Sequence, residues 1–120
     1  MAYQVLRAGE AEAYVRTEDW GDVNSLAGVA VGNALGVTLG RVSIKPGCND
    51  PLHAHDNCEE VIYVVSGVLG YSIGDETVIV REGDTLVVPA GVFHNGKNLG
   101  DTPAEIIVVH SAGTSDTRPA

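Results

Sequence analysis

Hydrophobic and polar residues alternate along several short stretches of this chain, most clearly along residues 36–45. Val42 and Ile44 fall on one side of this stretch, whereas Ser43 falls on the other. Successive side chains of a β-strand point to opposite faces of the sheet, so this alternation is typical of a strand with one buried face. The Pro46-Gly47 pair that follows predicts a turn at its end. We therefore expect residues 36–45 to form a strand that packs against a core.

Further strand-like stretches follow and indicate an all-β fold. The stretch 59–66 is almost continuously apolar after two carboxylates, which predicts a strand buried on both faces. The pair Gly74-Asp75 separates two Val-rich runs and predicts a two-residue β-hairpin. Residues 8–15 have weak helical periodicity, which predicts at most one or two helical turns. The expected strands are, in chain order, residues 36–45, 59–66, 68–73, 76–80, 85–88 and 103–110, after strand-like runs that begin near Leu26.

Composition supports the same fold class. The chain has 15 glycines, and Val rather than Leu dominates its aliphatic residues. Val favours strands because its branched Cβ suits a pleated sheet, and abundant glycine indicates tight turns between short strands. A length of 120 residues is that of one domain, and a hydrophobic fraction of 44% is enough for a packed core.

The net charge and the cysteines restrict the expected binding partners and the expected cellular compartment. The chain carries 16 acidic and 7 basic residues, a net charge of −9. A surface this negative repels phosphate backbones and anionic lipids, so neither nucleic acid nor a membrane is an expected partner. The apolar stretches are far shorter than the roughly 20 residues of a membrane span, and residues 1–7 lack the features of a signal peptide. We therefore expect a cytoplasmic protein, with Cys48 and Cys58 as reduced thiols.

Two glycine-bounded blocks, residues 47–67 and 83–98, carry three of the four histidines. His53 and His55 point to the same side of an extended strand, with their Cα atoms about 6.6–6.8 Å apart, so both rings can reach one ion. A neighbouring strand can present the carboxylate of Glu60, and a later strand can present His94. The pattern predicts a metal site with three nitrogen ligands, one oxygen ligand and open positions for substrate or water.

The spacing within both blocks resembles the two motifs of the cupin superfamily. The first motif reads Gly, five residues, His-x-His, three or four residues, Glu, six residues, Gly, and its positions are filled by Gly47, His53, His55, Glu60 and Gly67. The second reads Gly, five residues, Pro-x-Gly, two residues, His, three residues, Asn, and its positions are filled by Gly83, Pro89, Gly91, His94 and Asn98. The resemblance implies a double-stranded β-helix, a jelly-roll barrel, with a metal ion inside its mouth.

Several neighbouring residues need separate interpretation. Glu59 competes with Glu60 as the carboxylate ligand, but the spacing to the next motif glycine selects Glu60. His110 lies outside both motifs and is interpreted as a barrel-rim or surface histidine rather than a fifth ligand. Asn98 is expected to serve turn geometry. The motif glycines are expected to adopt positive φ angles and are Gly47, Gly67, Gly83 and Gly91.

The ligand set restricts the metal without choosing one. Three imidazoles and a carboxylate suit one divalent transition metal per chain, namely Mn, Fe, Co, Ni, Cu or Zn. Calcium and magnesium are disfavoured because both prefer shells of oxygen ligands. Binding requires neutral imidazoles, so we expect the metal to be lost below about pH 6.

Fold and ligands leave three functions open, because neither determines a reaction. The favoured one is an oxidoreductase of the dioxygenase type that acts on a small chelating organic substrate, such as an enediol, a diketone or a phenolic compound. One alternative is a metal-dependent isomerase, epimerase, lyase or cyclase acting on a sugar, a keto acid or a polyketide-like substrate. The other is a non-catalytic module that binds a small ligand or a metal. No catalytic side chain beyond the metal centre is evident.

The expected organisation is an N-terminal arm (residues 1–22), a cupin barrel (23–110) and a loose C-terminal tail (111–120). The tail is rich in Ser, Thr, Gly, Asp and Pro, a composition typical of a poorly ordered terminus. The cupin resemblance implies pairing of two chains, and residues 2–7 have the alternation that an arm added to a neighbour's sheet would need. We therefore expect a homodimer.

Overall fold

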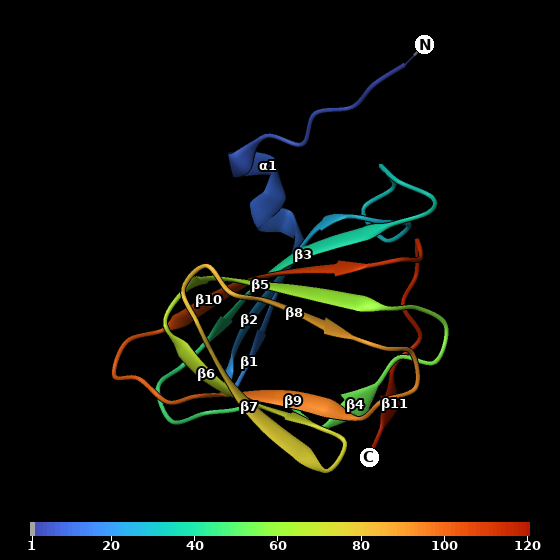
Figure 1. Ribbon diagram of the computed structural model, residues 1–120. Helices are drawn as coiled ribbons and strands as arrows, with labels where there is room; N and C mark the ends of the chain where they lie inside the picture. The colour runs from blue at the N-terminus through green and yellow to red at the C-terminus, as the bar shows by residue number, and fades with distance from the viewer. Residues whose placement is uncertain (1) are drawn as a thin grey trace.

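The computed structural model describes residues 2–120, and within them the chain forms two antiparallel β-sheets that pack face to face (Figure 1). The six strands of the first sheet are, in spatial order, β1 (Val15–Glu18), β2 (Gly21–Ala27), β3 (Thr38–Ile44), β10 (Ala104–His110), β5 (Glu60–Ser66) and β8 (Thr85–Val88). The five strands of the second are β11 (Arg118–Pro119), β4 (His53–Ala54), β9 (His94–Asn98), β6 (Val68–Ile73) and β7 (Glu76–Arg81). The predicted all-β jelly-roll barrel is confirmed.

The core lies between the sheets and is built from alternate residues of their strands. On β5, Ile62 and Val64 are buried, and they face the interior together with Ile106 of β10 and Leu69 of β6. Strands β5, β9 and β10 bury alternate side chains because strand side chains point to opposite faces in turn. The core is therefore the common inner surface of both sheets.

The prediction that β5 is buried on both faces is wrong. Glu60, Ile62 and Val64 are buried, but the side chain between the last two, Tyr63, is 45% exposed. The outer face of β5 carries the alternate set of residues, of which Tyr63 is exposed and Val61 and Val65 are partly buried. The run of apolar residues therefore reflects one face turned to the core and one apolar face turned outward.

The predicted hairpin and turns are confirmed. Gly74-Asp75 joins β6 to β7, and all four motif glycines have positive φ angles. Gly67 shows why the residue type matters, because its φ is +101° and a Cβ built there would lie 2.9 Å from the Cβ of Ala104. Asn98 serves turn geometry as expected, because its side-chain amide donates to the carbonyl oxygens of Ile44 and Thr102.

The two ends of the chain are more ordered than the sequence indicates. The short helix α1 (Ala8–Ala11) and the 3₁₀ turn Glu12–Tyr14 confirm the weak helical prediction, and the extended segment before them runs away from the barrel (Figure 1). Strands β1 and β2 were not expected, and the arm boundary at residue 22 falls inside β2. Met1, the first residue of the expected arm, lies outside the described residues. The division of the chain into three parts stays a prediction.

The segment 111–120, expected to be loose, instead packs along the barrel. Its strand β11 pairs with β4, and Arg118 donates to both carboxylate oxygens of Asp56 at 2.8 and 3.0 Å. The guanidinium of Arg118 also lies 4.6 Å from the ring centroid of Phe93. These contacts join residues far apart in sequence, so the polar composition of the segment gave no sign of them.

Two further features complete the description. Cys48 and Cys58 are free thiols, as expected. Within residues 2–120, no helix has the length and apolar character needed to cross a membrane.

Candidate metal centre

The four predicted ligands come together inside the barrel, and they come from both sheets. His53 of β4 lies directly opposite His94 of β9, and His55 follows β4 by one residue. Glu60 begins β5 in the facing sheet. One potential ligand atom from each of these four residues lies within 4.8 Å of the others, so the group could hold a metal ion.

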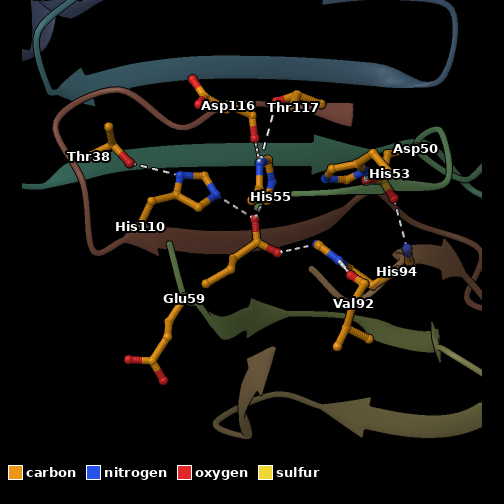
Figure 2. A network of polar contacts seen from close by, with 12 residues as sticks. Thr38, Asp50, His53, His55, Glu59, Val92, His94, His110, Asp116 and Thr117 are labelled. Atoms are coloured by element: carbon orange, nitrogen blue, oxygen red, sulfur yellow. Dashed lines mark hydrogen bonds and ion pairs between the residues drawn. The ribbon is translucent and has the colours of Figure 1, made fainter. Parts of the chain in front are cut away.

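Backbone carbonyl groups determine which nitrogen of each ring faces the centre. The Nδ1 atoms of the three rings contact carbonyl oxygens. His53 contacts Pro51 at 2.6 Å, and Figure 2 shows His55 with Asp116, at 3.0 Å, and His94 with Val92, at 2.9 Å. A carbonyl oxygen only accepts, so Nδ1 carries the hydrogen in each ring. In a neutral ring Nε2 then has a free lone pair, which is the form that binds a metal.

The histidine Nε2 atoms and the Glu60 carboxylate oxygens that face the centre suit a bound cation. Nε2 of His94 lies 2.6 Å from Oε2 of Glu60, and Nε2 of His55 lies 3.4 Å from Oε1. Yet the buried Nε2 of His94 makes no hydrogen bond of acceptable geometry within the described chain. Lone pairs of neutral rings and of a carboxylate repel one another unless a proton or a metal ion lies among them. The donor set of three imidazoles and one carboxylate suits a divalent transition metal.

The electrostatics of the group favour an ionised Glu60. Burial by itself raises its pKa, but the close contacts of its carboxylate with His110, His55 and His94 outweigh burial and hold the pKa well below its usual range. For His94, burial lowers the pKa, and the contact with the Glu60 carboxylate raises it above the ordinary value. The carboxylate therefore stays charged, and its positive partner is either a protonated ring or a bound metal.

Glu59 and Glu60 lie in opposite directions. Glu60 is 6% exposed and its carboxylate contacts His55, His94 and His110. Glu59 is exposed, and its side chain points away from the histidines (Figure 2). Adjacent residues of an extended chain point to opposite sides, so only one of the two can reach the cluster. The spacing argument for Glu60 agrees with this geometry.

The interpretation of His110 as a rim or surface histidine is wrong. His110 is the last residue of β10 and lines the cavity, with Nε2 at 2.6 Å from Oε1 of Glu60 and Nδ1 at 2.8 Å from Oγ1 of Thr38 (Figure 2). Its ring centroid lies 4.5 Å from that of His55. Only the pairing of β10 with its neighbours reveals these contacts, so no motif pointed to His110.

The C-terminal segment also contributes to the site. The carbonyl oxygen of Asp116 holds Nδ1 of His55, and the hydroxyl of Thr117 lies 3.4 Å from the same nitrogen. The Asn57 side chain donates to the carbonyl of Thr114 and accepts from the backbone amide of Asp116. A segment that composition placed outside the barrel therefore orients one of the candidate ligands.

A cavity of about 470 Å³ extends from the cluster between the sheets. Volumes of roughly 300–1,000 Å³ are typical of small-molecule sites. The histidines and Glu60 line one end, and most of the remaining wall is apolar, including Trp20, Val23, Val31, Val42, Ile106 and Val108. Among the described lining residues, Arg16 is the one with a permanent positive charge, and its side chain is 69% exposed beside Glu18.

A second carboxyl group lies close to the ligands. Oδ1 of Asp50 accepts from the amide of Gly96 at 2.8 Å, and Oδ2 lies 3.8 Å from Nδ1 of His53. Burial raises the pKa of Asp50 to about 6, the Gly96 hydrogen bond lowers it in part, and the charge of Glu60 raises it further. Asp50 precedes the first histidine by three residues, but its burial is evident only in the folded chain.

A model of the cupin domain family matches residues 40–110, more than half of the chain. The chain therefore belongs to the cupin family, in agreement with both motifs and with the barrel.

Curated relatives include plant proteins. Germin-like protein 3-8 of Oryza sativa subsp. japonica is 39% identical over 85 residues, which cover 67% of this chain and 38% of that protein. Germin-like protein subfamily 2 member 1 of Arabidopsis thaliana is 34% identical over 91 residues, 72% of this chain and 42% of that protein. The chain thus spans about two-fifths of the length of these relatives.

Solved structures show the same barrel. A recombinant oxalate oxidase in complex with glycolate has a TM-score of 0.76 at 30% identity and covers 85% of this chain and 56% of its own. A Lactobacillus farciminis oxalate decarboxylase–formate complex has a TM-score of 0.81 over 88% of this chain and 32% of its own. Its 24% identity supports the fold alone.

Replacement of Asp50 by Asn tests the buried carboxyl group. A folded-state pKa near 6 against an unfolded value near 3.8 means that the folded chain retains the Asp50 proton between these values. The stability associated with this proton is complete below about pH 4 and is lost as the pH rises through 6. We expect Asp50→Asn to match the wild type near pH 4 and to exceed it at pH 7.5 by on the order of 2 kcal/mol.

Denaturant unfolding of the metal-free protein at the two pH values measures this difference. Wild type and Asp50→Asn share all other titrating groups, so the contributions of those groups cancel in the difference between their free energies of unfolding. Asp75→Asn, in the exposed turn between β6 and β7, is the matched control. An equal difference between Asp50→Asn and wild type at both pH values would contradict the raised pKa.

Proposed function

We propose that this chain binds one divalent transition metal and acts as an oxidoreductase of the dioxygenase type on a small chelating organic substrate. The ligands are Nε2 of His53, His55 and His94 and one carboxylate oxygen of Glu60. The observation that carries the proposal is the convergence of these four groups at one end of a cavity large enough for a substrate. The oxalate oxidase structure, 30% identical and in complex with glycolate, supports an oxidoreductase that acts on a small oxygen-bearing compound.

Bound there, a redox-active metal such as Mn or Fe would supply Lewis acidity and electron transfer to a substrate that chelates it. The protein holds the three rings through backbone carbonyls, so the ligands are oriented before the substrate enters. The apolar wall excludes water from the substrate. A dioxygenase reaction needs no external reductant, because both atoms of O₂ enter the substrate and the substrate supplies the electrons.

The cavity favours a substrate with an apolar body and an oxygen-bearing chelating end. Val42 and Val108 belong to the wall that such a body would contact, and burial of apolar surface favours binding by about 25 cal/mol per Å². Oxalate lacks an apolar body. The described lining residues offer no buried cation that could compensate a second carboxylate not held by the metal. We therefore propose an enediol, a diketone or a phenolic compound.

Variants of the ligands test metal binding. We expect His53→Ala and Glu60→Ala to lose most or all of the metal, because each removes one of four donors, while the barrel stays folded on its Val and Ile core. Glu59→Ala is the matched control and keeps full occupancy, since its side chain is exposed and points away. Elemental analysis of protein purified without added metal measures the occupancy of each variant, and calorimetric titration then measures its affinity for the metal.

The same preparations test the pH dependence. Protons compete with the metal for the imidazole nitrogens, so occupancy should fall below about pH 6. Full metal content in either ligand variant, or full retention in the wild type at pH 4.5, would show that these residues do not hold the ion.

Oxygen uptake tests the reaction. We expect Mn- or Fe-loaded wild type to consume O₂ with 4-alkylcatechols faster than with oxalate, and to incorporate label from ¹⁸O₂ into the product. Uptake should be absent from Glu60→Ala and unchanged in Glu59→Ala. Turnover of a substrate with the Zn-loaded protein and no uptake of O₂ would instead favour a non-redox isomerase or lyase. Metal binding with no turnover of either kind would favour a binding module.

We also propose a cytoplasmic homodimer. Tyr3 and Val5 of the N-terminal segment are 84% and 53% exposed, and Tyr63 and Val87 on the outer face of the six-stranded sheet are 45% and 52% exposed. Burial of these groups against a second chain would remove apolar surface from water. Light scattering should give the mass of two 12.5 kDa chains for the wild type and of one chain after deletion of residues 2–7. A monomeric wild type would contradict the proposal.

A further inference from the structure

Three polar side chains form a row across three neighbouring strands. In the six-stranded sheet β10 lies between β3 and β5, and His110 is directly opposite Thr38 on one side and Glu60 on the other. Directly opposed residues of antiparallel strands have Cβ atoms roughly 4.5–5.5 Å apart. All three side chains line the cavity. Their contact therefore follows from strand register and does not depend on a flexible loop.

The hydrogen bonds in this row have a definite direction. The Glu60 carboxylate is ionised and only accepts, so Nε2 of His110 carries the hydrogen of the 2.6 Å contact. In the neutral ring Nδ1 then accepts from the Thr38 hydroxyl at 2.8 Å. His110 thus has the opposite tautomer to the three candidate ligands and presents an N–H group to the cluster instead of a lone pair.

The carboxylate of Glu60 has two oxygens with different surroundings. Oε1 accepts from Nε2 of His110 at 2.6 Å and lies 3.4 Å from Nε2 of His55, whereas Oε2 lies 2.6 Å from Nε2 of His94. A hydrogen bond on one oxygen limits rotation of the carboxylate and leaves the other as the free donor.

We propose that His110 is a positioning residue of the metal centre, which holds Oε1 of Glu60 by a hydrogen bond so that Oε2 is the oxygen that ligates the ion, with Thr38 maintaining the tautomer of His110. The inference rests on the metal binding proposed above and deepens it. Ligation through one oxygen leaves coordination positions open for a chelating substrate.

Matched variants of His110 separate this role from a purely structural one. His110→Leu removes the donor, and His110→Gln retains an amide N–H at similar reach. We expect His110→Leu to weaken Mn(II) and Co(II) binding by about 10–100-fold and to change the visible spectrum of the Co(II) protein, whereas His110→Gln restores most of both. X-ray absorption should count three imidazole ligands in the wild type and in His110→Leu.

Thr38 supplies a second test that keeps His110 in place. Thr38→Val should weaken binding several-fold, and Thr38→Ser should not, because Ser retains the hydroxyl. Thr85→Val, at an exposed position of β8, is the control for the Thr-to-Val change. Thermal unfolding followed by circular dichroism checks that each variant is folded. If His110→Leu does not fold, the comparison of Thr38→Val with Thr38→Ser tests the positioning role instead.

The possible failures are distinct. Wild-type affinity and spectrum in His110→Leu, or in Thr38→Val where that pair decides, would overturn the positioning role and leave the proposed function intact. A count of four imidazoles in the wild type would make His110 a ligand and overturn the role. A wild-type chain that binds neither Mn(II) nor Co(II) would overturn this inference and the proposed function together.

Discussion

The site depends on one buried charge, the carboxylate of Glu60. A carboxylate in this position is unfavourable unless positive or hydrogen-donating groups surround it. Here His55, His94 and His110 do so, and they hold its pKa below the usual range despite burial. The potential ligand atoms of His53, His55, Glu60 and His94 lie within 4.8 Å of one another. The placement of three of the four histidines around Glu60 thus meets the electrostatic need of this one side chain.

The two sheets have to pack closely for this cluster to form. His53 and His94 are opposed residues of one sheet, whereas Glu60 begins a strand of the other. Packing of the core residues on the inner faces, such as Ile62 and Leu69, sets the distance between the sheets. Loosening of the core would therefore separate the donors, which links the stability of the barrel to its affinity for a cation.

Backbone carbonyl groups fix the orientation of the three candidate ligand rings. Those of Pro51 and Val92 precede His53 and His94 by two residues, so local chain geometry orients these rings. His55 instead depends on Asp116, in a segment that pairs with β4 through β11. The apolar wall then begins where the polar donors end. This contrast suits a ligand with one chelating end and one apolar end.

The sequence alone determined the features that depend on short spacings. Alternation predicted β3, motif glycines marked the turns, and the spacing to Gly67 selected Glu60 over Glu59, because local chain geometry sets which way neighbouring residues point. Only the tertiary structure decided the position of His110 in the cavity, the packing of residues 111–120 and the exposure of Tyr63 on the outer face of β5. These depend on which distant strands become neighbours and in what register. Which distant strands pair is determined by closure of the whole barrel. Local periodicity over a few residues cannot predict this pairing.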